Sequence, residues 1–339
     1  MLSSNNMERN NLSSPPPGRE GSRNKILCIG EALIDMICTD KGKSLSDGVN
    51  FLKKPGGAPT NVAAAIAALG GSVELAAKVG ADPFGKHLID VMQSFGVSTK
   101  WMLQDENNFT TFAFVSLMEN GERDFFFNRG ADGQLTRQEV EDIDLNEFSI
   151  IHFGSATGFL PGPLQAAYSG LLQKALQKNI LISFDPNYRH LLFQNNLQTF
   201  IDQSWNFLES CHFFKVSDEE AMLITGCAAL EDAAAFLLKK TTAIFAITLG
   251  KDGTMLGVNG KTIIIESIPV KPVDTTGAGD AFVGAVLFQL SFKSFEEIKS
   301  LSDLEWKKII YNGNKAGGRT CEYLGAMEAF KHLSNDIFN

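Results

Sequence analysis

The chain has 339 residues, of which 44% are hydrophobic and 20% are charged, and its formal net charge is −9. This is enough apolar sequence for one large α/β domain or for one and a half domains. An acidic chain without a long basic run argues against nucleic acid or an anionic membrane surface as the main partner. No run reaches the roughly 18 apolar residues of a membrane-spanning helix, so we expect no membrane span.

Residues 1–24 are rich in Asn, Ser, Pro and Gly and contain almost no apolar side chains. Such a stretch buries too little surface to offset its ordering entropy, so we expect a disordered tail. It also lacks the apolar core of a signal peptide. The five cysteines form no CxxC pair and no metal-ligand spacing, which indicates reduced thiols and a cytoplasmic location: Cys28, Cys38, Cys211, Cys227 and Cys321.

Strand-like and helix-like segments alternate from Lys25 onward. Lys25–Ile37 is an apolar run long enough for a strand and its turn, and Val73–Val79 resembles a strand. Further short apolar runs, typical of strands buried on both faces, are Ile150–Phe153, Ile180–Phe184, Phe213–Val216 and Ala243–Thr248. Helical patterns occupy Asn61–Leu69, Phe84–Phe95, Pro163–Gln177, Leu197–Leu208, Asp218–Ile224 and Leu230–Lys239. The alternation predicts a mainly parallel sheet covered by helices.

One region interrupts this rhythm. Thr110–Met118 and Arg123–Phe127 flank an Asn-Gly pair at residues 120–121, which is a strong hairpin signal. We expect the segment Ile37–Phe51 to add strands beside this hairpin. Together they predict a small sheet that projects from the α/β body and covers a site.

The first glycine-rich loop, Pro55–Asn61, precedes an Ala-rich helix. Asn61 lies near the helix start, where its amide either caps the helix or holds a ligand hydroxyl. The paired glycines Gly56 and Gly57 allow close approach to the backbone and favour the ligand.

Two polar clusters follow predicted strands. Asp185–Arg189 supplies an arginine whose fork of donors suits phosphate oxygens, and Asp218-Glu219-Glu220 supplies carboxylates suited to Mg²⁺. Taken singly, each cluster has an equally good structural explanation: a turn with a helix cap for the first, and an acidic first helical turn for the second. Their shared place at strand ends favours function.

A second glycine-rich loop, Thr248–Gly253, leaves a buried strand, and such loops carry ligands in parallel sheets. An ordinary turn is the alternative. After it, Thr254–Val258 and Thr262–Ser267 flank Asn259-Gly260, a hairpin that we expect to extend the main sheet.

The most informative segment is Val273–Phe282, where a glycine-rich turn enters an apolar helix with Asp280 in its first turn. Backbone N–H groups at a helix N-terminus attract anions, and glycines let a phosphate approach. A carboxylate there would repel the phosphate unless it accepts a proton from the attacking nucleophile. The segment matches neither GxGxxG nor a P-loop. It predicts a phosphoryl-transfer site.

These motifs resemble those of the ribokinase (PfkB carbohydrate kinase) family, and most of all its fructokinase branch, over residues 25–333. The resemblance rests on Gly56–Asn61 and on Asp274–Phe282. It implies a three-layer α/β/α fold with a central, mainly parallel sheet and a small β-sheet lid, whose strands are inserted near residues 37–51 and 110–127.

The same resemblance implies roles for individual residues. Asp280 corresponds to the catalytic base, and the amides of Gly277, Ala278 and Gly279 correspond to the anion hole. The sugar-binding positions are Asp35, Gly56, Gly57, Asn61 and Asp280. The ATP-binding positions are Asn187, Arg189, Thr248, Gly250, Gly253, Gly277, Gly279 and Asn314.

The family also implies Mg²⁺ bound with ATP and K⁺ as an activator. Glu220 keeps the place of the family's Mg²⁺-linked glutamate, and Ser217 replaces the asparagine three residues before it, which points to an indirect metal contact. Asp274, with backbone oxygens around Thr276 and Gly325, resembles the monovalent-cation site. In related kinases the lid sheet also joins two subunits, so a homodimer is expected.

The implied reaction is phosphorylation of a ketohexose by ATP, with fructose giving fructose 6-phosphate as the leading assignment. After the hairpin, the run Asn128–Gly133 lacks a proline that fructokinases often carry. Phosphorylation of 2-keto-3-deoxygluconate or ribose is the alternative. A non-catalytic sugar or nucleotide sensor is the rival from another class, and the intact Asp280 argues against it.

Overall fold

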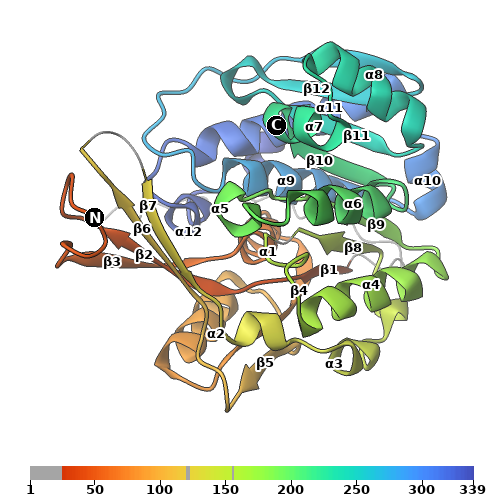
Figure 1. Ribbon diagram of the computed structural model, residues 1–339. Helices are drawn as coiled ribbons and strands as arrows, with labels where there is room; N and C mark the ends of the chain where they lie inside the picture. The colour runs from red at the N-terminus through yellow and green to blue at the C-terminus, as the bar shows by residue number, and fades with distance from the viewer. Residues whose placement is uncertain (1–24, 120–122, 155) are drawn as a thin grey trace, which may run out of the picture.

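The computed structural model describes residues 25–119, 123–154 and 156–339, and the predicted N-terminal tail and the Asn-Gly turn lie outside this part of the chain. The described residues form a large α/β body with a small sheet projecting from it (Figure 1). This is the ribokinase-like α/β fold that the sequence predicts.

A nine-stranded sheet runs through the body in the order β13-β12-β11-β10-β9-β8-β1-β4-β5. Its strands pair in parallel from β11 to β5, and β12 and β13 form an antiparallel hairpin at one edge. The strands are β1 (Lys25–Ile29), β4 (Ser72–Gly80), β5 (Met102–Asp105), β8 (Ile150–Phe153), β9 (Leu181–Phe184), β10 (Phe213–Ser217), β11 (Ile244–Thr248), β12 (Thr254–Val258) and β13 (Lys261–Ile265). The buried runs and the second hairpin are thus confirmed.

Helices cover both faces of this sheet, each over its own apolar core. One core contains α1 (Ala58–Ala68), α2 (Pro83–Phe95), α9 (Ala278–Ser291), α10 (Phe295–Lys299), α11 (Asp303–Thr320) and α12 (Ala326–Phe330). The other contains α3 (Arg137–Glu141), α4 (Pro163–Leu176), α5 (His190–Phe193), α6 (Leu197–Leu208), α7 (Asp218–Thr225) and α8 (Leu230–Lys240).

The helices α1 and α9 are buried on nearly all sides and pack directly on each other. A Cβ atom on Gly284 of α9 would lie only 2.8 Å from Cβ of Ala65 in α1, so the close contact requires glycine there. This contact fixes the first turns of the two helices, which carry Asn61 and Asp280.

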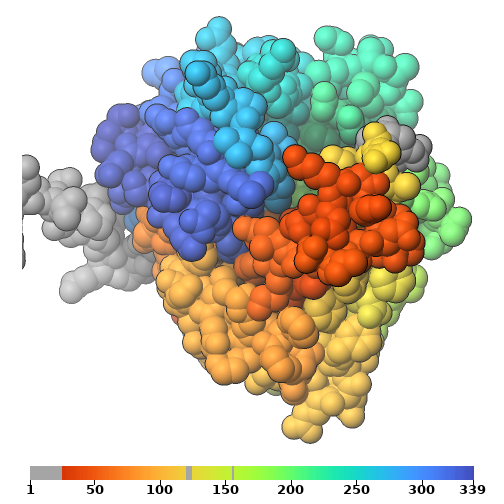
Figure 2. All heavy atoms as spheres, turned by 90° about the vertical axis from the view of Figure 1, so that its left-hand side faces the viewer, coloured from red at the N-terminus to blue at the C-terminus, as the bar shows by residue number. Residues whose placement is uncertain are grey.

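The small sheet has four strands in the order β3-β2-β6-β7: β2 (Leu33–Cys38), β3 (Phe51–Gly56), β6 (Phe112–Leu117) and β7 (Arg123–Asn128). β6 and β7 form the expected antiparallel pair. Figure 2 shows β2 and β3, in red and orange, next to the blue C-terminal helices, and β3 contacts α12. The predicted small sheet therefore exists.

Two expectations about the N-terminal strands need correction. The run Lys25–Ile37 is not one strand with a turn, because Gly30, at φ 146°, divides it into β1 and β2 of different sheets. The segment Ile37–Phe51 contributes strand only at its two ends. Between them the Asp40 carboxylate accepts hydrogen bonds from the backbone N–H groups of Val49 and Asn50 at 2.7 and 2.9 Å, which holds the connection as turns.

All five cysteines are free, as expected. In the part of the chain that is described, no helix alone has the length and apolar composition to cross a membrane; α7 and α8 pass that test only when this bent pair is taken together.

Candidate active site

The N-terminus of α9 begins at Gly277, which has φ 82° and offers no side-chain cap. A Cβ atom at this position would collide with Ala326, so both the backbone angle and the space require glycine. The Ala278 N–H group donates a hydrogen bond of 3.2 Å to the Thr275 carbonyl. An apolar helix whose first amides lack a side-chain cap is suited to bind an anion.

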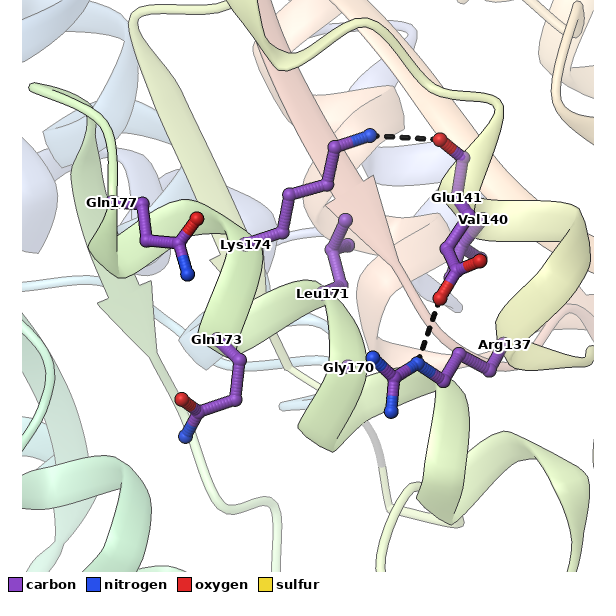
Figure 3. Close-up of a pocket in the computed structure, with 8 residues that line it drawn as sticks. All are labelled: Arg137, Val140, Glu141, Gly170, Leu171, Gln173, Lys174 and Gln177. Atoms are coloured by element: carbon purple, nitrogen blue, oxygen red, sulfur yellow. Dashed lines mark hydrogen bonds and ion pairs between the residues drawn. The ribbon is translucent and has the colours of Figure 1, made fainter.

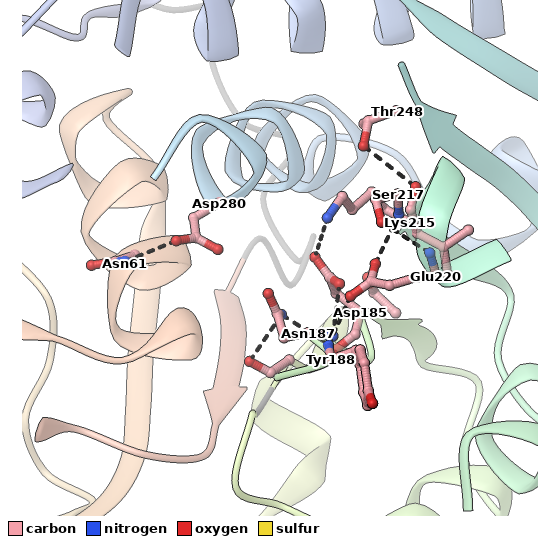
Figure 4. A network of polar contacts seen from close by, with 12 residues as sticks. Asn61, Asp185, Asn187, Tyr188, Lys215, Ser217, Glu220, Thr248 and Asp280 are labelled. Carbon is pink, nitrogen blue, oxygen red and sulfur yellow. Dashed lines mark hydrogen bonds and ion pairs between the residues drawn. The ribbon is translucent and has the colours of Figure 1, made fainter. Parts of the chain in front are cut away.

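Asp280 and Asn61 meet across α9 and α1, although 219 residues separate them (Figure 4). The Asn61 amide donates a hydrogen bond of 2.8 Å to Asp280 Oδ2. Burial raises the pKa of Asp280, and the Asn61 hydrogen bond and the charges of Arg189 and Lys215 oppose the increase. Asp280 is therefore a stronger base than an exposed aspartate. Its neighbours limit the increase in pKa because they favour the ionised form.

Asp35 faces the site from β2, opposite Lys54 of β3. A side chain on Gly56 would meet the Asp35 carboxylate, and one on Gly57, at φ 107°, would meet the Glu31 carbonyl. Burial and the nearby Glu31 charge raise the pKa of Asp35 to about 6, against the effect of Arg189. Gly56 thus makes room for the Asp35 carboxylate, and Gly57 makes room for the backbone carbonyl of Glu31.

The exposed Arg189 acts on both carboxylates, because its charge opposes the raised pKa values of Asp35 and Asp280. Its guanidinium donates to the Tyr188 carbonyl at 3.0 Å. Asn187, next to it, is buried and has φ 46°, a left-handed backbone that asparagine tolerates better than most residues. The Asp185–Arg189 loop therefore lies near the predicted sugar-binding residues Asp35 and Asp280 and near the N-terminus of α9.

Glu220 fixes that loop to the end of β10. Its carboxylate accepts hydrogen bonds from the backbone N–H groups of Tyr188 at 2.7 Å and Ser217 at 2.8 Å, while the Ser217 hydroxyl accepts from the Glu220 N–H. Both oxygens thus have amide donors. Among the described residues no group of three or more His, Cys, Asp or Glu side chains is arranged to hold a metal.

The predicted nucleotide positions follow β11. Thr248 ends that strand, and Gly250 and Gly253 have φ values of 58° and 98°. Asn314 of α11 is buried, and its side chain accepts from the Thr254 hydroxyl at 2.6 Å and donates to the Ile265 and Glu266 carbonyls. Its polar atoms therefore join α11 to the β12–β13 hairpin, a role that the sequence did not indicate.

Asp274 organises the loop before α9. Its carboxylate accepts hydrogen bonds from the Thr276 N–H at 3.0 Å, the Thr276 hydroxyl at 2.7 Å and the Gly325 N–H at 2.8 Å. These bonds lower the pKa of Asp274 despite partial burial, with a smaller effect from the Lys54 charge. The structure thus brings together Asp274, Thr276 and Gly325.

A protein-family comparison identifies the family of the chain. Residues 23–332 match the model of the pfkB family of carbohydrate kinases. The chain belongs to this family.

Relatives of this pfkB kinase cover nearly the whole chain. It is 34% identical to the probable fructokinase-4 of Arabidopsis thaliana, over 91% of this chain and 94% of that protein, and 36% identical to fructokinase-1 of Zea mays, over 90% and 94%. Among solved structures, the fructokinase of Xylella fastidiosa with bound ATP has a TM-score of 0.82 at 26% identity, covering 93% of this chain and 97% of that one. The Vibrio cholerae fructokinase with fructose, ADP and calcium has a TM-score of 0.76 at 27% identity, covering 93% and 98%.

Sequence reasoning missed three buried polar residues around this pfkB kinase site. Glu31 lies directly after Gly30, and one of its carboxylate oxygens accepts from the Ala58 N–H at 3.0 Å. Asp185 and Lys215 face each other at 3.3 Å from the neighbouring strands β9 and β10. Lys215 gave a signal as a charged residue within the otherwise apolar run Phe213–Val216, and Asp185 gave one as the first residue of the polar cluster Asp185–Arg189, but neither was assigned a role.

A hollow of about 290 Å³ lies elsewhere, between α3 and α4 (Figure 3). Its charged groups are engaged, since Arg137 contacts Glu141 at 2.8 Å and Lys174 donates to the Glu141 and Ile143 carbonyls. None of the predicted site residues lines it.

Proposed function

We propose that this pfkB kinase transfers the γ-phosphate of ATP to fructose and gives fructose 6-phosphate. The relatives named fructokinase support the sugar, and the family supports the reaction class. The observation that carries the proposal is the buried Asn61–Asp280 pair at the uncapped N-terminus of α9, with Asp35 facing it from the small sheet.

In the proposed reaction Asp280 takes the proton of the sugar hydroxyl while the hydroxyl oxygen bonds to the γ-phosphorus. The bond from the γ-phosphorus to the bridging oxygen breaks, and ADP leaves with that oxygen. The amides of Gly277, Ala278 and Gly279 receive the negative charge of the transferring group. The raised pKa of Asp280 supports its role, because a more basic carboxylate accepts the proton earlier in the transfer.

The sugar is held by Asp35, Gly56, Gly57, Asn61 and Asp280 in this proposal. Asp35 accepts hydrogen bonds from sugar hydroxyls, and the two glycines let the ring approach the backbone. Within the described residues, Asn61 Oδ1 is buried without a hydrogen-bond partner. A buried acceptor of this kind is costly unless a ligand hydroxyl donates to it, which supports a sugar at this point.

ATP lies along the other side of Asp280. We assign its phosphates to Asn187, Arg189, Gly277 and Gly279, and its nucleoside to the loop with Thr248, Gly250 and Gly253. Asn314 is assigned to the edge of the adenine. Because its side-chain amide is already hydrogen-bonded to Thr254, Ile265 and Glu266, it contacts the adenine only by van der Waals packing.

Mg²⁺ enters with ATP and neutralises phosphate charge. Because both Glu220 oxygens accept amide hydrogen bonds, Glu220 fits a contact to that ion through water better than direct ligation. For K⁺, Asp274 retains about one of its four acceptor sites, and the backbone oxygens of Thr276 and Gly325 supply the hard ligands. This set fits a weakly held cation that stiffens the loop before α9.

We further propose that residues 25–333 act as one cytoplasmic kinase domain, and that the small sheet is a lid and a dimer surface. The exposed fractions of Ile37, Leu117 and Phe126 are 40%, 60% and 57%, which is high for large apolar residues on one sheet. Phe112 and Phe114 stack on one face of this sheet, and Phe125 and Phe127 stack on the other. Each face therefore has its own apolar surface, one for the sugar and one for a partner.

A coupled assay of ADP release tests the function, with fructose, 2-keto-3-deoxygluconate, ribose and a nucleoside compared at equal concentration. We expect fructose to give the highest kcat/KM. A higher value for another of these sugars would overturn the sugar assignment. Tight binding of ATP or sugar without ADP release would support the sensor instead.

A further inference from the structure

Lys215 is a buried cation in the middle of a buried strand. Its side chain is 9% exposed, and its neighbours in β10, Phe214 and Val216, are fully apolar. An ammonium group in such surroundings costs several kcal/mol unless charged or polar partners compensate. Lys215 therefore lowers the stability of the fold, and packing alone does not explain why a lysine occupies this position.

The ammonium lies against the proposed anion hole. The Lys215 Nζ atom is 3.3 Å from the point that a Cβ atom on Gly279 would occupy, so it packs on the backbone of the second residue of α9. Figure 4 shows Lys215 extending from β10 beside the helix that carries Asp280. A positive charge is thus placed where the transferring group must pass.

Its ion pair with Asp185 is incomplete. The Lys215 Nζ and Asp185 Oδ2 atoms are 3.3 Å apart, but their geometry is not that of a hydrogen bond, and Oδ2 has no hydrogen-bond partner among the described residues. A lysine ammonium has three donors. Within the described part of the chain Asp185 is the acceptor beside them, which leaves the other donors available to a ligand.

The surrounding carboxylates keep the group charged. Burial lowers the pKa of Lys215, but Asp185, Glu220 and Asp280 outweigh it, and the net effect is a raised pKa. The same carboxylates would repel a polyphosphate if no cation lay among them. Lys215 is a cation among these carboxylates, and its charge favours a polyphosphate at this end of the site.

We propose that Lys215 is a catalytic residue that donates a hydrogen bond to a non-bridging oxygen of the transferring phosphoryl group, and that Asp185 is its positioning residue. This inference rests on the proposed kinase function. In the free enzyme the ammonium lies near Asp185; when the phosphoryl group is loosely bonded to both oxygens, Lys215 and the Gly279 amide share its charge.

The competing explanation is a purely structural ion pair between β9 and β10. A double mutant separates the two. Lys215→Met alone leaves Asp185 as an uncompensated buried charge and destabilises the fold, whereas Asp185→Asn/Lys215→Met removes both charges at nearly constant volume. If the pair is structural, the double mutant regains stability and activity together.

Steady-state kinetics, urea unfolding and calorimetry should be run on the wild type, both single mutants and the double mutant. Calorimetry compares ADP with ADP plus aluminium fluoride, a planar mimic of the transferring phosphoryl group, in the presence of fructose. We expect the double mutant to recover most of its stability while kcat stays about 10²–10³-fold below the wild type, as for loss of one oxyanion donor. The extra affinity that aluminium fluoride confers on ADP should fall by a similar factor.

Lys25→Met is the matched control. Lys25 forms ion pairs with Glu74 at 2.8 Å and Glu147 at 3.0 Å at the amino end of β1, away from the site. The Lys25→Met variant should be less stable than the wild type, but its kcat should stay within about twofold of the wild-type value.

A double mutant with kcat within about threefold of the wild type would overturn the inference. The inference would also fail if aluminium fluoride increased the affinity for ADP as much in the double mutant as in the wild type. If the wild type itself phosphorylates no sugar, the proposed function fails instead.

Discussion

The two ends of the site are built differently. At the proposed transfer end, Asp280 comes from α9, Asp185 directly follows β9, and Glu220 lies in the first turn of α7; all three are buried, and their charges act on Lys215. At the sugar end, Asp35 comes from the small sheet and is only half-buried, with room made for it by Gly56.

This difference separates two tasks. The transfer end needs charges held at fixed distances, which a close-packed body with helices on both faces supplies. The sugar end needs to admit and enclose a substrate, which suits a four-stranded sheet attached at the edge of the body. Variants of the two ends should therefore fail in different ways.

The largest effect is expected at the transfer end, from Asp280→Asn. The change preserves shape and a hydrogen bond to Asn61 but removes the base. We expect turnover to fall by about 10²–10⁴-fold, while affinity for ATP changes little. The measurement is kcat by ADP release, with ATP affinity by calorimetry. Turnover within about threefold of the wild type would remove Asp280 from the mechanism.

Asp35→Asn should produce an intermediate effect at the sugar end. One charge-assisted hydrogen bond contributes about 1.5–3 kcal/mol, so kcat/KM for fructose should fall by about 10- to 100-fold. At saturating fructose, kcat should stay within a few-fold of the wild type, which contrasts with Asp280→Asn. Asp47→Asn, on the exposed connection between β2 and β3, is the control. An equal loss of kcat would mean that the two ends are not separate.

The smallest effect concerns stability. The pKa of Asp35 is about 6 in the folded protein and roughly 3.9 when unfolded, so the folded state binds the proton more tightly. The Asp35 contribution is therefore favourable at low pH and is lost as the pH rises from about 4 to 6. At pH 8 the Tm of Asp35→Asn should be higher than that of the wild type by on the order of 2 °C. This difference in Tm should disappear near pH 4. A gap that does not change with pH would contradict this.

The main sheet could be predicted from sequence because its strands are short apolar runs buried on both faces. Runs such as Ile180–Phe184 and Phe213–Val216 carry that signal locally. The meeting of Asn61 with Asp280 was also foreseeable, but only through the family motifs, since nothing in the spacing of two residues 219 positions apart indicates contact.

The rest depended on three-dimensional neighbours. The Lys215–Asp185 pair joins two strands, and the sequence shows only one lysine in an apolar run and one aspartate after another. The boundary between β1 and β2 depends on one backbone angle at Gly30 within an unbroken apolar run. Asn314 fits an adenine contact in the sequence, and only the structure shows its amide bonded to β12 and β13.

The short segment 30–32, which connects β1 to β2, has an evolutionary consequence. The small sheet leaves the body there and returns through Gly56 and Gly57, and its second pair of strands is inserted far along the chain. In the proposed site, substitutions between residues 33 and 56 thus alter the sugar pocket without moving α9. Evolution can therefore change the substrate specificity of such an enzyme while the phosphoryl-transfer residues on α9 stay the same.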